Sequence, residues 1–514
     1  MNSKDSFNKI NIDFITLRDN VLNISGYLHC SNSKSGVVIF CNGEKITPKV
    51  FDYPSRKGED IFNFDFKVPV GEKAIKIEIK SQGNDYPIRF RKFSNISEYS
   101  TYYVKDDKIV FYDGSFNVVD YSYLKMFKIE LKNLFKIIKN RPSFFMHAVI
   151  FRLVYLILYV FMKSKQIWIV IDRKTMADDN AEHFFKYAVG QDDGIRKFFA
   201  IHNASDDFTR LKKLFSKNIL DADSVKHRFY YMFASKLISS QGSEFDLNPF
   251  LNKNYPLMAG VSNLDFYFLQ HGITLHDISS WLQKYDRNPK LIVTCAESES
   301  ESFKTDKYNF DENTIQTLGF PRFDNLNNDN VKKQIVIMPT WRRDLTDKDA
   351  FIKSEYFKHF NSLINNKRLI DFAQENGFEI LFKPHPELLK YIEFFDRNDY
   401  VKFIPSKKYQ EIFKESSILV TDYSSVAFDF AYLKKPLIYY QYGNDFHYEE
   451  SYFSYEEMGF GDIISNEEDL VNKIIHYIEN DCSLEKKYAD RVDDFFKYHD
   501  DMNSKRCYDF IKNH

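Results

Sequence analysis

One segment, residues 417–440, constrains the fold of this chain more than any other. It begins with an apolar run that predicts a buried strand, continues from Val426 with apolar residues at helical spacing, and ends in a second apolar run at 437–440. A Lys-Lys-Pro sequence ends the helix between the two strands. Strand, helix and strand in this order predict a βαβ unit, which is the building block of parallel α/β sheets.

Hydroxyls and free backbone N–H groups gather where the first strand of this unit meets the helix. The turn contains Thr421, Asp422, Ser424 and Ser425. A helix N-terminus presents unpaired N–H groups and the positive end of the helix dipole, so it is a favourable place for a phosphate group. The same residue types also act as ordinary helix caps. Both interpretations, a substrate-binding turn and a structural cap, stay open at this point.

Two histidines each follow a predicted strand, in different halves of the α/β pattern. His385 lies with Lys383 in a Lys-Pro-His-Pro sequence, whose prolines fix the backbone. His271 follows the strand at 266–269, and Gly272 after it lets another backbone or a ligand approach closely. A single loop histidine is usually structural. Two histidines at strand ends, where α/β proteins bind ligands, indicate a site.

Three further polar residues follow predicted strands. Arg322 lies in the sequence GFPRFD, Arg342 lies in PTWR, and Asn180 precedes a helix after the strand at 167–171. The sequences QHG, GFPRFD, PTWR, KPHP and TDYSS, in this order, resemble the CDP-glycerol glycerophosphotransferase family, which makes teichoic-acid and capsule polymers. The resemblance covers about residues 165–480, and the combination is specific although each sequence alone is weak. The pairing of His-Pro with Ser-Ser is also similar to bacterial CMP-sialic acid transferases.

The resemblance implies a fold and a reaction. The fold is α/β, a GT-B-like pair of Rossmann-type domains. The reaction transfers glycerol phosphate or ribitol phosphate from a CDP-polyol donor to a hydroxyl of a lipid-linked or polymeric acceptor in teichoic acid or capsule synthesis, and it releases CMP. No cofactor or metal is implied. His276 stands where the family more often has a basic residue, which leaves the identity of the acceptor open.

The resemblance also implies roles for single residues. His271 is the expected general base and His385 the expected donor to the diphosphate, with the reverse assignment left open and with His276 and Asp277 close enough in sequence to substitute or orient. The expected substrate-binding residues are Asn180, Gly272, Arg322, Arg342, Lys383, Thr421, Asp422, Ser424 and Ser425.

Two other classes of function compete with this one. The first is a GT-B glycosyltransferase that uses a CMP- or UDP-sugar, and the second is a non-catalytic, membrane-bound protein that binds the polymer. Sugar-transferring GT-B enzymes often carry paired glutamates at the donor ribose, whereas the matching helix here has Asp422 and Asp429, which argues against a standard UDP-sugar enzyme. The presence of both histidines, Arg342 and the Ser pair disfavours a non-catalytic protein.

Asp221 and Asp223 form a D-x-D sequence, a form that occurs at metal-dependent donor sites. No convincing strand precedes it in the sequence pattern. A polar loop is therefore the favoured interpretation, and no metal site is predicted.

The composition limits which binding partners and which cellular compartment we expect for this chain. Lys and Arg number 71 and Asp and Glu number 73, which gives a formal net charge of −2, so no nucleic-acid partner is expected. The N-terminal sequence has no apolar segment typical of a secretory signal. Five cysteines without paired metal-ligand spacing fit a reduced, cytosolic setting: Cys30, Cys41, Cys295, Cys482 and Cys507.

Outside the resemblance, the chain begins with a region that looks all-β. Residues 1–118 contain predicted strands at 36–40, 75–80 and 108–112, with Asn-Gly and Asp-Gly hairpin turns, and suggest a small sandwich. This domain is expected either to bind acceptor polymer or to serve as a structural or dimerising module, and a homo-oligomer is left open. The remaining predicted domains are 166–330 (acceptor), 331–480 (CDP donor) and 481–514 (C-terminal helices).

Residues 119–165 predict two helices that associate with a membrane. The first carries an apolar stripe from Tyr123 to Ile138 with lysines between, and the second is rich in aromatic residues. Its uninterrupted apolar part, 153–162, is short of the ~20 residues that span a bilayer, and Arg152 precedes it. We expect peripheral binding to an anionic membrane surface on the cytoplasmic face. A hairpin packed on the protein and a transmembrane span are the alternatives.

Overall fold

The computed structural model describes most of the chain, which divides into two compact units. The described residues are 10–29, 37–51, 61–71, 74–81, 87–91, 94–243, 247–250, 255–342, 345, 347–443 and 452–514. Unit 1 is Met1–Leu269, Ile278–Ile292 and Lys304–Ile315, and unit 2 is Gln270–Asp277, Val293–Phe303 and Gln316–His514. Cys30 and the first residue of the strand predicted at 36–40 lie outside the described residues.

The first part of unit 1 is a β-sandwich. One sheet has the strand order β5-β6-β2-β1-β8 and the other β4-β3-β7-β11-β10-β9. Side chains such as Ile12, Phe64, Ile77 and Phe116 alternate inward and form one core, which is why these strands pack as two layers. The strands are β1 (Ile10–Arg18), β2 (Val21–His29), β3 (Val37–Cys41), β4 (Glu44–Ile46), β5 (Lys49–Val50), β6 (Ile61–Pro69), β7 (Ile75–Ser81), β8 (Ile88–Phe90), β9 (Tyr102–Lys105), β10 (Lys108–Tyr112) and β11 (Phe116–Asp120).

The two predicted hairpin turns of the sandwich are confirmed. Asn42 and Gly43, with φ of 50° and 90°, connect β3 to its antiparallel neighbour β4. Gly114, with φ of 106°, lies between the antiparallel strands β10 and β11. Positive φ is what a tight hairpin turn requires and what glycine and asparagine adopt most readily, so the sequence signal had a direct structural cause.

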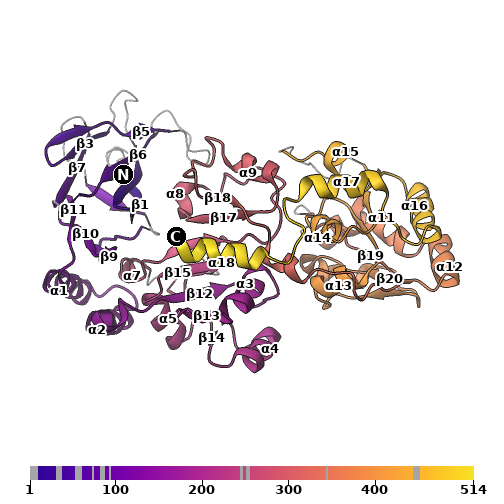
Figure 1. The fold of residues 1–514 in the computed structure, drawn as a ribbon, viewed down its shortest axis with the longest axis horizontal. Coiled ribbons are helices and arrows are strands. Elements are labelled where there is room, and N and C mark those ends of the chain that lie inside the picture. The colour runs from indigo at the N-terminus through magenta and orange to yellow at the C-terminus, as the bar shows by residue number, and fades with distance from the viewer. Residues whose placement is uncertain are drawn as a thin grey trace. The chain divides into compact units, whose positions relative to one another are not determined.

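Two helices, α1 (Tyr123–Asn140) and α2 (Phe145–Met162), follow the sandwich and lie side by side (Figure 1). In the middle of α2, Arg152 is fully buried, and its Nε and Nη2 donate to the carboxylate of Glu130 in α1, each at 2.6 Å. Nη1 of Arg152 also donates to the carbonyl of Leu257 at 2.8 Å. The two helices are therefore fixed to each other and to the body of unit 1 by one buried guanidinium.

The outer sides of α1 and α2 form an exposed apolar face, which we call the α1–α2 face. By length and composition α2 is able to cross a membrane, with 18 residues, a mean hydropathy of 2.0 and 28% of the helix buried. Lys128, Lys132 and Lys139 of α1 are also exposed. The exposed apolar residues are Tyr123, Leu124, Leu131, Phe135, Ile138, Phe144, Met146, Ile150, Leu153, Ile157, Val160 and Phe161.

A sheet with the strand order β14-β13-β12-β15-β16-β17-β18 follows. The pairs from β14 to β17 are parallel, and β12 (Ile167–Ile171) is buried along its whole length, as expected for a sheet covered on both faces by helices. The other elements between residues 180 and 325 are α3 (Asn180–Val189), β13 (Arg196–Ile201), α4 (Asp206–Phe215), β14 (Ile219–Asp221), α5 (Val225–Met232), β15 (Lys236–Ser239), α7 (Tyr255–Met258), β16 (Asp265–Phe268), α8 (Lys284–Arg287), β17 (Leu291–Thr294), α9 (Glu297–Phe303), β18 (Ile315–Thr317) and the 3-10 helix η1 (Pro321–Asn325). Of these, α9 and η1 belong to unit 2.

Unit 2 contains a second sheet, with the strand order β21-β20-β19-β22-β23-β24 and only parallel pairs among its described strands. Most of the helices drawn in orange and yellow in Figure 1 lie around this sheet. The elements are β19 (Gln334–Ile337), α10 (Lys348–Lys353), α11 (Glu355–Ile364), α12 (Lys367–Glu375), β20 (Glu379–Phe382), η2 (Pro386–Phe394), β21 (Val401–Phe403), α13 (Tyr409–Glu415), β22 (Ile418–Thr421), α14 (Val426–Tyr432), β23 (Leu437–Tyr440), α15 (Tyr455–Met458), β24 (Asp462–Ile464), α16 (Glu467–Glu479), α17 (Lys486–Phe495) and α18 (Asn503–Asn513).

The predicted βαβ unit is confirmed as β22, α14 and β23, with the two strands parallel neighbours. The helix ends at Tyr432, and Lys434 has a positive φ of 52° before Pro436, so the Lys-Lys-Pro sequence does stop the helix. Two parallel α/β sheets preceded by an antiparallel β region confirm the predicted fold class, a GT-B-like pair of Rossmann-type domains with a small all-β domain and an amphipathic helical segment before it.

Candidate active site

Asp422 organises the turn between β22 and α14 in unit 2. Its carboxylate accepts from the backbone N–H groups of Thr340 and Tyr423, both at 2.8 Å, and binds Nη2 of Arg342 at 2.8 Å. Asp422 and Arg342 are both buried. Because Thr340 and Arg342 follow β19, this carboxylate ties together the ends of two neighbouring strands and fixes the path of the TDYSS turn.

The Ser pair lies at the start of α14 and is half-buried. Ser425 occupies the N-cap position, but its side chain accepts no capping hydrogen bond. Ser424 Oγ accepts from the backbone N–H of Val426 at a long 3.4 Å. The hydroxyl of Ser425 is therefore not used to cap the helix, so the capping interpretation does not explain this residue.

His385 lies at the corner between β20 and η2. Its Nδ1 accepts a hydrogen bond from the backbone N–H of Glu387 at 3.2 Å, and its ring stacks on Trp341 with a centroid distance of 6.0 Å and an interplanar angle of 13°. A neutral imidazole that accepts at Nδ1 carries its proton on Nε2. His385 is therefore held as a hydrogen-bond donor, both in its neutral and in its charged form.

His271 lies in the loop 270–277, which belongs to unit 2 and also contains His276 and Asp277. The side chain of His271 is exposed. A Cβ atom placed on Gly272 would lie 3.1 Å from Oγ of Ser425, which is tighter than ordinary van der Waals contact. The glycine therefore lets the QHG loop approach the TDYSS turn, and the two sequence motifs come together within one compact unit.

The three cations of the sequence prediction are buried, and each has protein partners. Arg322 binds both oxygens of Asp429 through Nε at 2.6 Å and Nη2 at 2.8 Å. Lys383 donates to the carbonyl of Pro405 at 2.6 Å and to that of Lys407 at 2.7 Å, and burial lowers the pKa of this lysine to about 8. Arg342 is held by Asp422, so all three cations hold the frame of unit 2.

Thr421 and Asn180 are also buried. The hydroxyl of Thr421 donates to the carbonyl of Met338 at 2.7 Å, which joins β22 to the end of β19. Asn180 belongs to unit 1, where its Nδ2 donates to the carbonyl of Leu269 at 3.2 Å and its backbone lies at the start of α3. Asp172, which the sequence did not single out, accepts from the backbone N–H groups of Ala181 and Glu182 and so orients this helix start.

The expectation about the D-x-D sequence was wrong in one respect, because β14 runs directly into Asp221. This strand has only three residues, too few for an alternating pattern to identify. Asp221 accepts from the backbone and side chain of Asn203, and Asp223 binds Lys174 at 3.0 Å. Among the described residues, no group of three or more His, Cys, Asp or Glu side chains is arranged to hold a metal ion.

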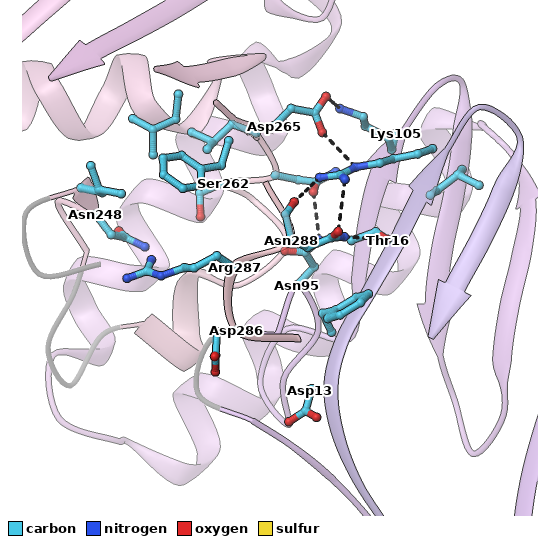
Figure 2. A pocket seen from close by; sticks show the side chains of 18 of the residues that line it. Asp13, Thr16, Asn95, Lys105, Asn248, Ser262, Asp265, Asp286, Arg287 and Asn288 are labelled. Atoms are coloured by element: carbon cyan, nitrogen blue, oxygen red, sulfur yellow. Dashed lines mark hydrogen bonds and ion pairs between the residues drawn. The ribbon is translucent and has the colours of Figure 1, made fainter. Parts of the chain in front are cut away.

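Unit 1 contains a polar cavity of about 100 Å³ between the sandwich and the following α/β part (Figure 2). Asp265 lines it and accepts from Lys105 at 2.7 Å, with Lys290 at 3.3 Å and Arg18 at 3.8 Å. Burial alone raises the pKa of Asp265, but these cations outweigh it and hold the pKa well below its usual range. Ligand pockets usually measure roughly 300 Å³ or more. This cavity is therefore too small for a nucleotide and is a polar contact region between the sandwich and the α/β part of unit 1.

The sequence prediction missed three residues of unit 2 that contact predicted site residues or their loops. Trp341 supports the ring of His385, and its place beside Arg342 in PTWR was the available signal. Asp429 was noted only for its spacing, yet it binds Arg322. Glu299 is fully buried and hydrogen-bonds to the loop of His271, but it lies in an alternating Glu-Ser segment that gives no sign of burial.

Comparison with known proteins identifies relatives of this chain. The sequence pattern of the CDP-Glycerol:Poly(glycerophosphate) glycerophosphotransferase family matches residues 152–513. The minor teichoic acid biosynthesis protein GgaB of Bacillus subtilis (strain 168) is 42% identical over 446 residues, which are 82% of this chain and 49% of GgaB. The chain thus spans about half the length of that relative. A teichoic acid glycerol-phosphate transferase of Staphylococcus aureus (strain NCTC 8325 / PS 47) is 32% identical over 147 residues, 28% of this chain and 36% of that protein.

A solved structure of the wall teichoic acid polymerase TagF shares the fold. Its TM-score is 0.53 at 18% sequence identity, and the match covers 76% of this chain and 98% of that one. At this identity the likeness concerns the fold, whereas the family pattern covers more than half of the sequence. The chain therefore belongs to the CDP-glycerol:poly(glycerophosphate) glycerophosphotransferase family of transferases, whose relatives named above act in teichoic acid biosynthesis.

Proposed function

We propose that this chain transfers glycerol phosphate, or ribitol phosphate, from a CDP-polyol donor to a hydroxyl of a lipid-linked or polymeric acceptor in teichoic acid or capsule synthesis. The observation that carries the proposal is the approach of Gly272 to Ser425, because it joins the loop of His271 to the turn at the start of α14. The family match and the fold shared with TagF, of which one variant was soaked with CDPG, support this donor class.

The proposed reaction is a displacement at phosphorus. The acceptor hydroxyl attacks the phosphorus that bears the polyol, a new O–P bond forms, the bond to CMP breaks, and the hydroxyl proton moves to His271. His385 donates from Nε2 to the diphosphate, a role supported by the hydrogen bond that occupies its Nδ1. A base has to accept a proton, and His385 in this tautomer presents a proton instead, which favours His271 as the base.

The other predicted residues are proposed to act in two groups. Gly272, Ser424 and Ser425 would contact the donor directly, since the two serines are half-buried and the backbone at Gly272 is unshielded by a side chain. The buried residues Arg322, Arg342, Lys383, Thr421 and Asp422 would fix the backbone around the donor site, and Lys383, which is bound only to carbonyl groups in the contacts above, would add positive potential around the diphosphate. Asn180 is proposed to contribute from the start of α3.

Release of CMP tests this proposal and separates it from its competitors. The chain would be incubated with CDP-glycerol, CDP-ribitol or CMP-sialic acid and a soluble glycerol phosphate oligomer as acceptor. We expect CMP from one of the CDP-polyols. CMP from CMP-sialic acid alone would make the chain a glycosyltransferase, and polymer binding without release from any donor would make it a non-catalytic binding protein.

We also propose that the α1–α2 face binds an anionic membrane from the cytoplasmic side. Eleven large apolar side chains of the two helices and that of Phe144, which precedes α2, are exposed, and exposed lysines accompany them on α1. Arg152 is buried and bound to Glu130, which supports an interfacial position for α2 and disfavours a span. The membrane would then bring a lipid-linked acceptor to the protein.

For the β-sandwich we propose a structural or dimerising function, with acceptor binding as the alternative. Its contacts within unit 1 support the structural role, since Arg18, Lys105 and Arg91 of this part bind Asp265 and Asp286 of the α/β part. If the sandwich has a dimerising role, we expect the chain to form a homo-oligomer. Sedimentation of the chain, which measures its oligomeric state, tests this.

Replacing Ser424 and Ser425 together with alanine is expected to weaken CDP-polyol binding by about tenfold, because two charge-assisted contacts to a diphosphate would be lost. Stability should fall by no more than about 0.5–2 kcal/mol, the range for a lost helix cap. Calorimetric titration and thermal melting measure the two effects. The half-buried cap Ser454 of α15, whose Oγ accepts from Glu457 N at 3.2 Å, provides the matched control. Unchanged donor affinity with a large fall in melting temperature would support the capping interpretation.

A further inference from the structure

We propose that Gln270 and Glu299 are positioning residues that hold His271 in its working place. This inference rests on the proposed function, in which His271 is the general base. It assigns a role to the first residue of the QHG motif and to a buried acid that the sequence did not reveal. All of the residues involved belong to unit 2.

Gln270 holds a strained backbone directly before His271. Its φ of 58° lies in the left-handed region, which glycine and asparagine adopt readily and a glutamine adopts at a cost in free energy. The side chain is buried and fully engaged. Nε2 donates to the carbonyl of Val293 at 2.7 Å and to Oε1 of Glu299 at 3.1 Å, while Oε1 accepts from Oγ1 of Thr274 at 2.7 Å.

Glu299 of α9 holds the loop on the other side of His271. The same Oε1 that accepts from Gln270 also accepts from the backbone N–H of Thr274 at 2.9 Å, and Oε2 accepts from the backbone N–H of Cys295 at 3.0 Å. The side chain is fully buried, and burial raises its pKa to about 7. Burying a carboxyl group costs free energy. Here the buried carboxylate hydrogen-bonds to Gln270 before His271 and to Thr274 after it, so one group holds the loop on both sides of the histidine.

The geometry explains why an exposed histidine can still be well placed. The side chain of His271 is exposed, and only three residues separate Gln270 from Thr274, so the position of His271 depends on where the two ends of this short span are held. The Gly272 backbone within this span is also the part that approaches Ser425. Loosening either end would shift the imidazole relative to the donor turn, and a misplacement of about 1 Å can lower a rate by roughly 10²-fold.

The test compares turnover with donor affinity. Gln270→Met removes all three amide hydrogen bonds at similar volume, and Glu299→Gln turns one acceptor oxygen into an N–H donor that faces other donors. Each variant is expected to lower kcat for CMP release by about tenfold or more while KM for the CDP-polyol changes by less than about twofold. Glu301→Gln, an exposed Glu-to-Gln change on the same helix, is the matched control and should match the wild type.

A milder pair of variants keeps the test decisive if either change prevents folding. Thr274→Val removes the hydroxyl bound by Gln270 and should lower kcat, and Thr274→Ser, which keeps the hydroxyl, should restore most of it. A second readout uses a His271→Ala background. There, Gln270→Met should cause no further loss, because a residue that acts only through His271 has nothing left to position.

The outcomes distinguish this inference from the proposed function. The positioning role alone would be overturned by one set of results. In that set the wild type is active, His271→Ala is inactive, and the Gln270, Glu299 and Thr274→Val variants have a normal kcat. Equal, additive losses in the presence and absence of His271 would overturn it as well, since they indicate general damage. If the wild type releases no CMP from either CDP-polyol, or His271→Ala is as active as the wild type, the proposed function fails and this inference fails with it.

Discussion

Alanine at His271 or at His385 is expected to lower the turnover of CMP release by at least about 10²-fold, since each residue would be removed from proton transfer or from charge stabilisation in the transition state. The two losses should have different characters. His271→Ala removes the proposed base and should lower kcat with little effect on donor binding. His385→Ala removes a donor to the diphosphate and should affect donor binding as well. Initial rates over a range of CDP-polyol concentrations measure both.

His385 needs a second substitution, because its Nδ1 also accepts from Glu387 N at the start of η2. Asparagine in its place keeps an acceptor near the position of Nδ1 and removes the Nε2 proton. We therefore expect His385→Asn to be as inactive as His385→Ala but closer to the wild type in thermal stability. His476→Ala, at an exposed histidine of α16, is the control. Near-normal CMP release from a folded His271 or His385 variant, as judged by circular dichroism, would remove that residue from the mechanism.

Much of the fold was predictable because local signals were strong. The unit β22-α14-β23 was marked by two apolar runs, a helical spacing and a Lys-Lys-Pro stop, and the hairpin at Asn42 was marked by a turn that needs positive φ. The fully apolar strand β12 was equally clear. The short strand β14 was missed, since three residues carry too little pattern to separate a strand from a loop.

The candidate site was predictable in its motifs and not in its contacts. Strand ends of a parallel sheet gather at one edge, so the positions of His385 and of the Ser pair followed from the pattern. The partners of the arginines did not follow from it. Arg322 binds Asp429, 107 residues away in the chain, and Arg342 binds Asp422, 80 residues away. Only the folded structure shows that these guanidinium groups already have carboxylate partners.

Glu299 illustrates a different limit. The segment of α9 alternates glutamate and serine, which is a composition typical of an exposed helix, yet Glu299 is fully buried. Its carboxylate accepts from N–H groups of a loop about 25 residues earlier in the chain, and a sequence pattern does not reveal such a contact. Buried acids of this kind are found only when the structure supplies their donors.

The amphipathic segment was predicted as one apolar stripe, and the structure divides that stripe in two. Met126 and Leu134 of α1 face inward and are buried, whereas Leu131 and Phe135 face outward and are exposed. The inward part anchors the helices to unit 1, together with the ion pair between Glu130 and Arg152. The outward part is exposed, with Leu131 at 47% and Phe135 at 69%, which is the arrangement expected of a surface that enters a lipid interface.

Reversing the charge of three lysines on α1 is expected to release the protein from anionic vesicles. Lys128, Lys132 and Lys139 are exposed, and each lysine near an anionic surface contributes about 1 kcal/mol, so their replacement by glutamate should weaken binding by more than about 100-fold at low salt. Lys125 and Lys136 are left unchanged, because Lys125 lies over the ring of Phe111 and Lys136 donates to the carbonyl of Glu98. Flotation with phosphatidylglycerol-containing vesicles measures the loss.

Three exposed lysines elsewhere in unit 1, Lys213, Lys217 and Lys226, provide a control with the same change in net charge. Their reversal should leave flotation unchanged, and neither triple variant should alter CMP release with a soluble acceptor. A triple variant of α1 that still floats at moderate salt would refute electrostatic anchoring by this helix. The apolar α2 would then be the sole anchor. To cross the bilayer, α2 would have to separate Arg152 from Glu130. A span would therefore expose a buried charge at a cost of several kcal/mol. Retained flotation would therefore indicate shallow insertion of the outer side of α2.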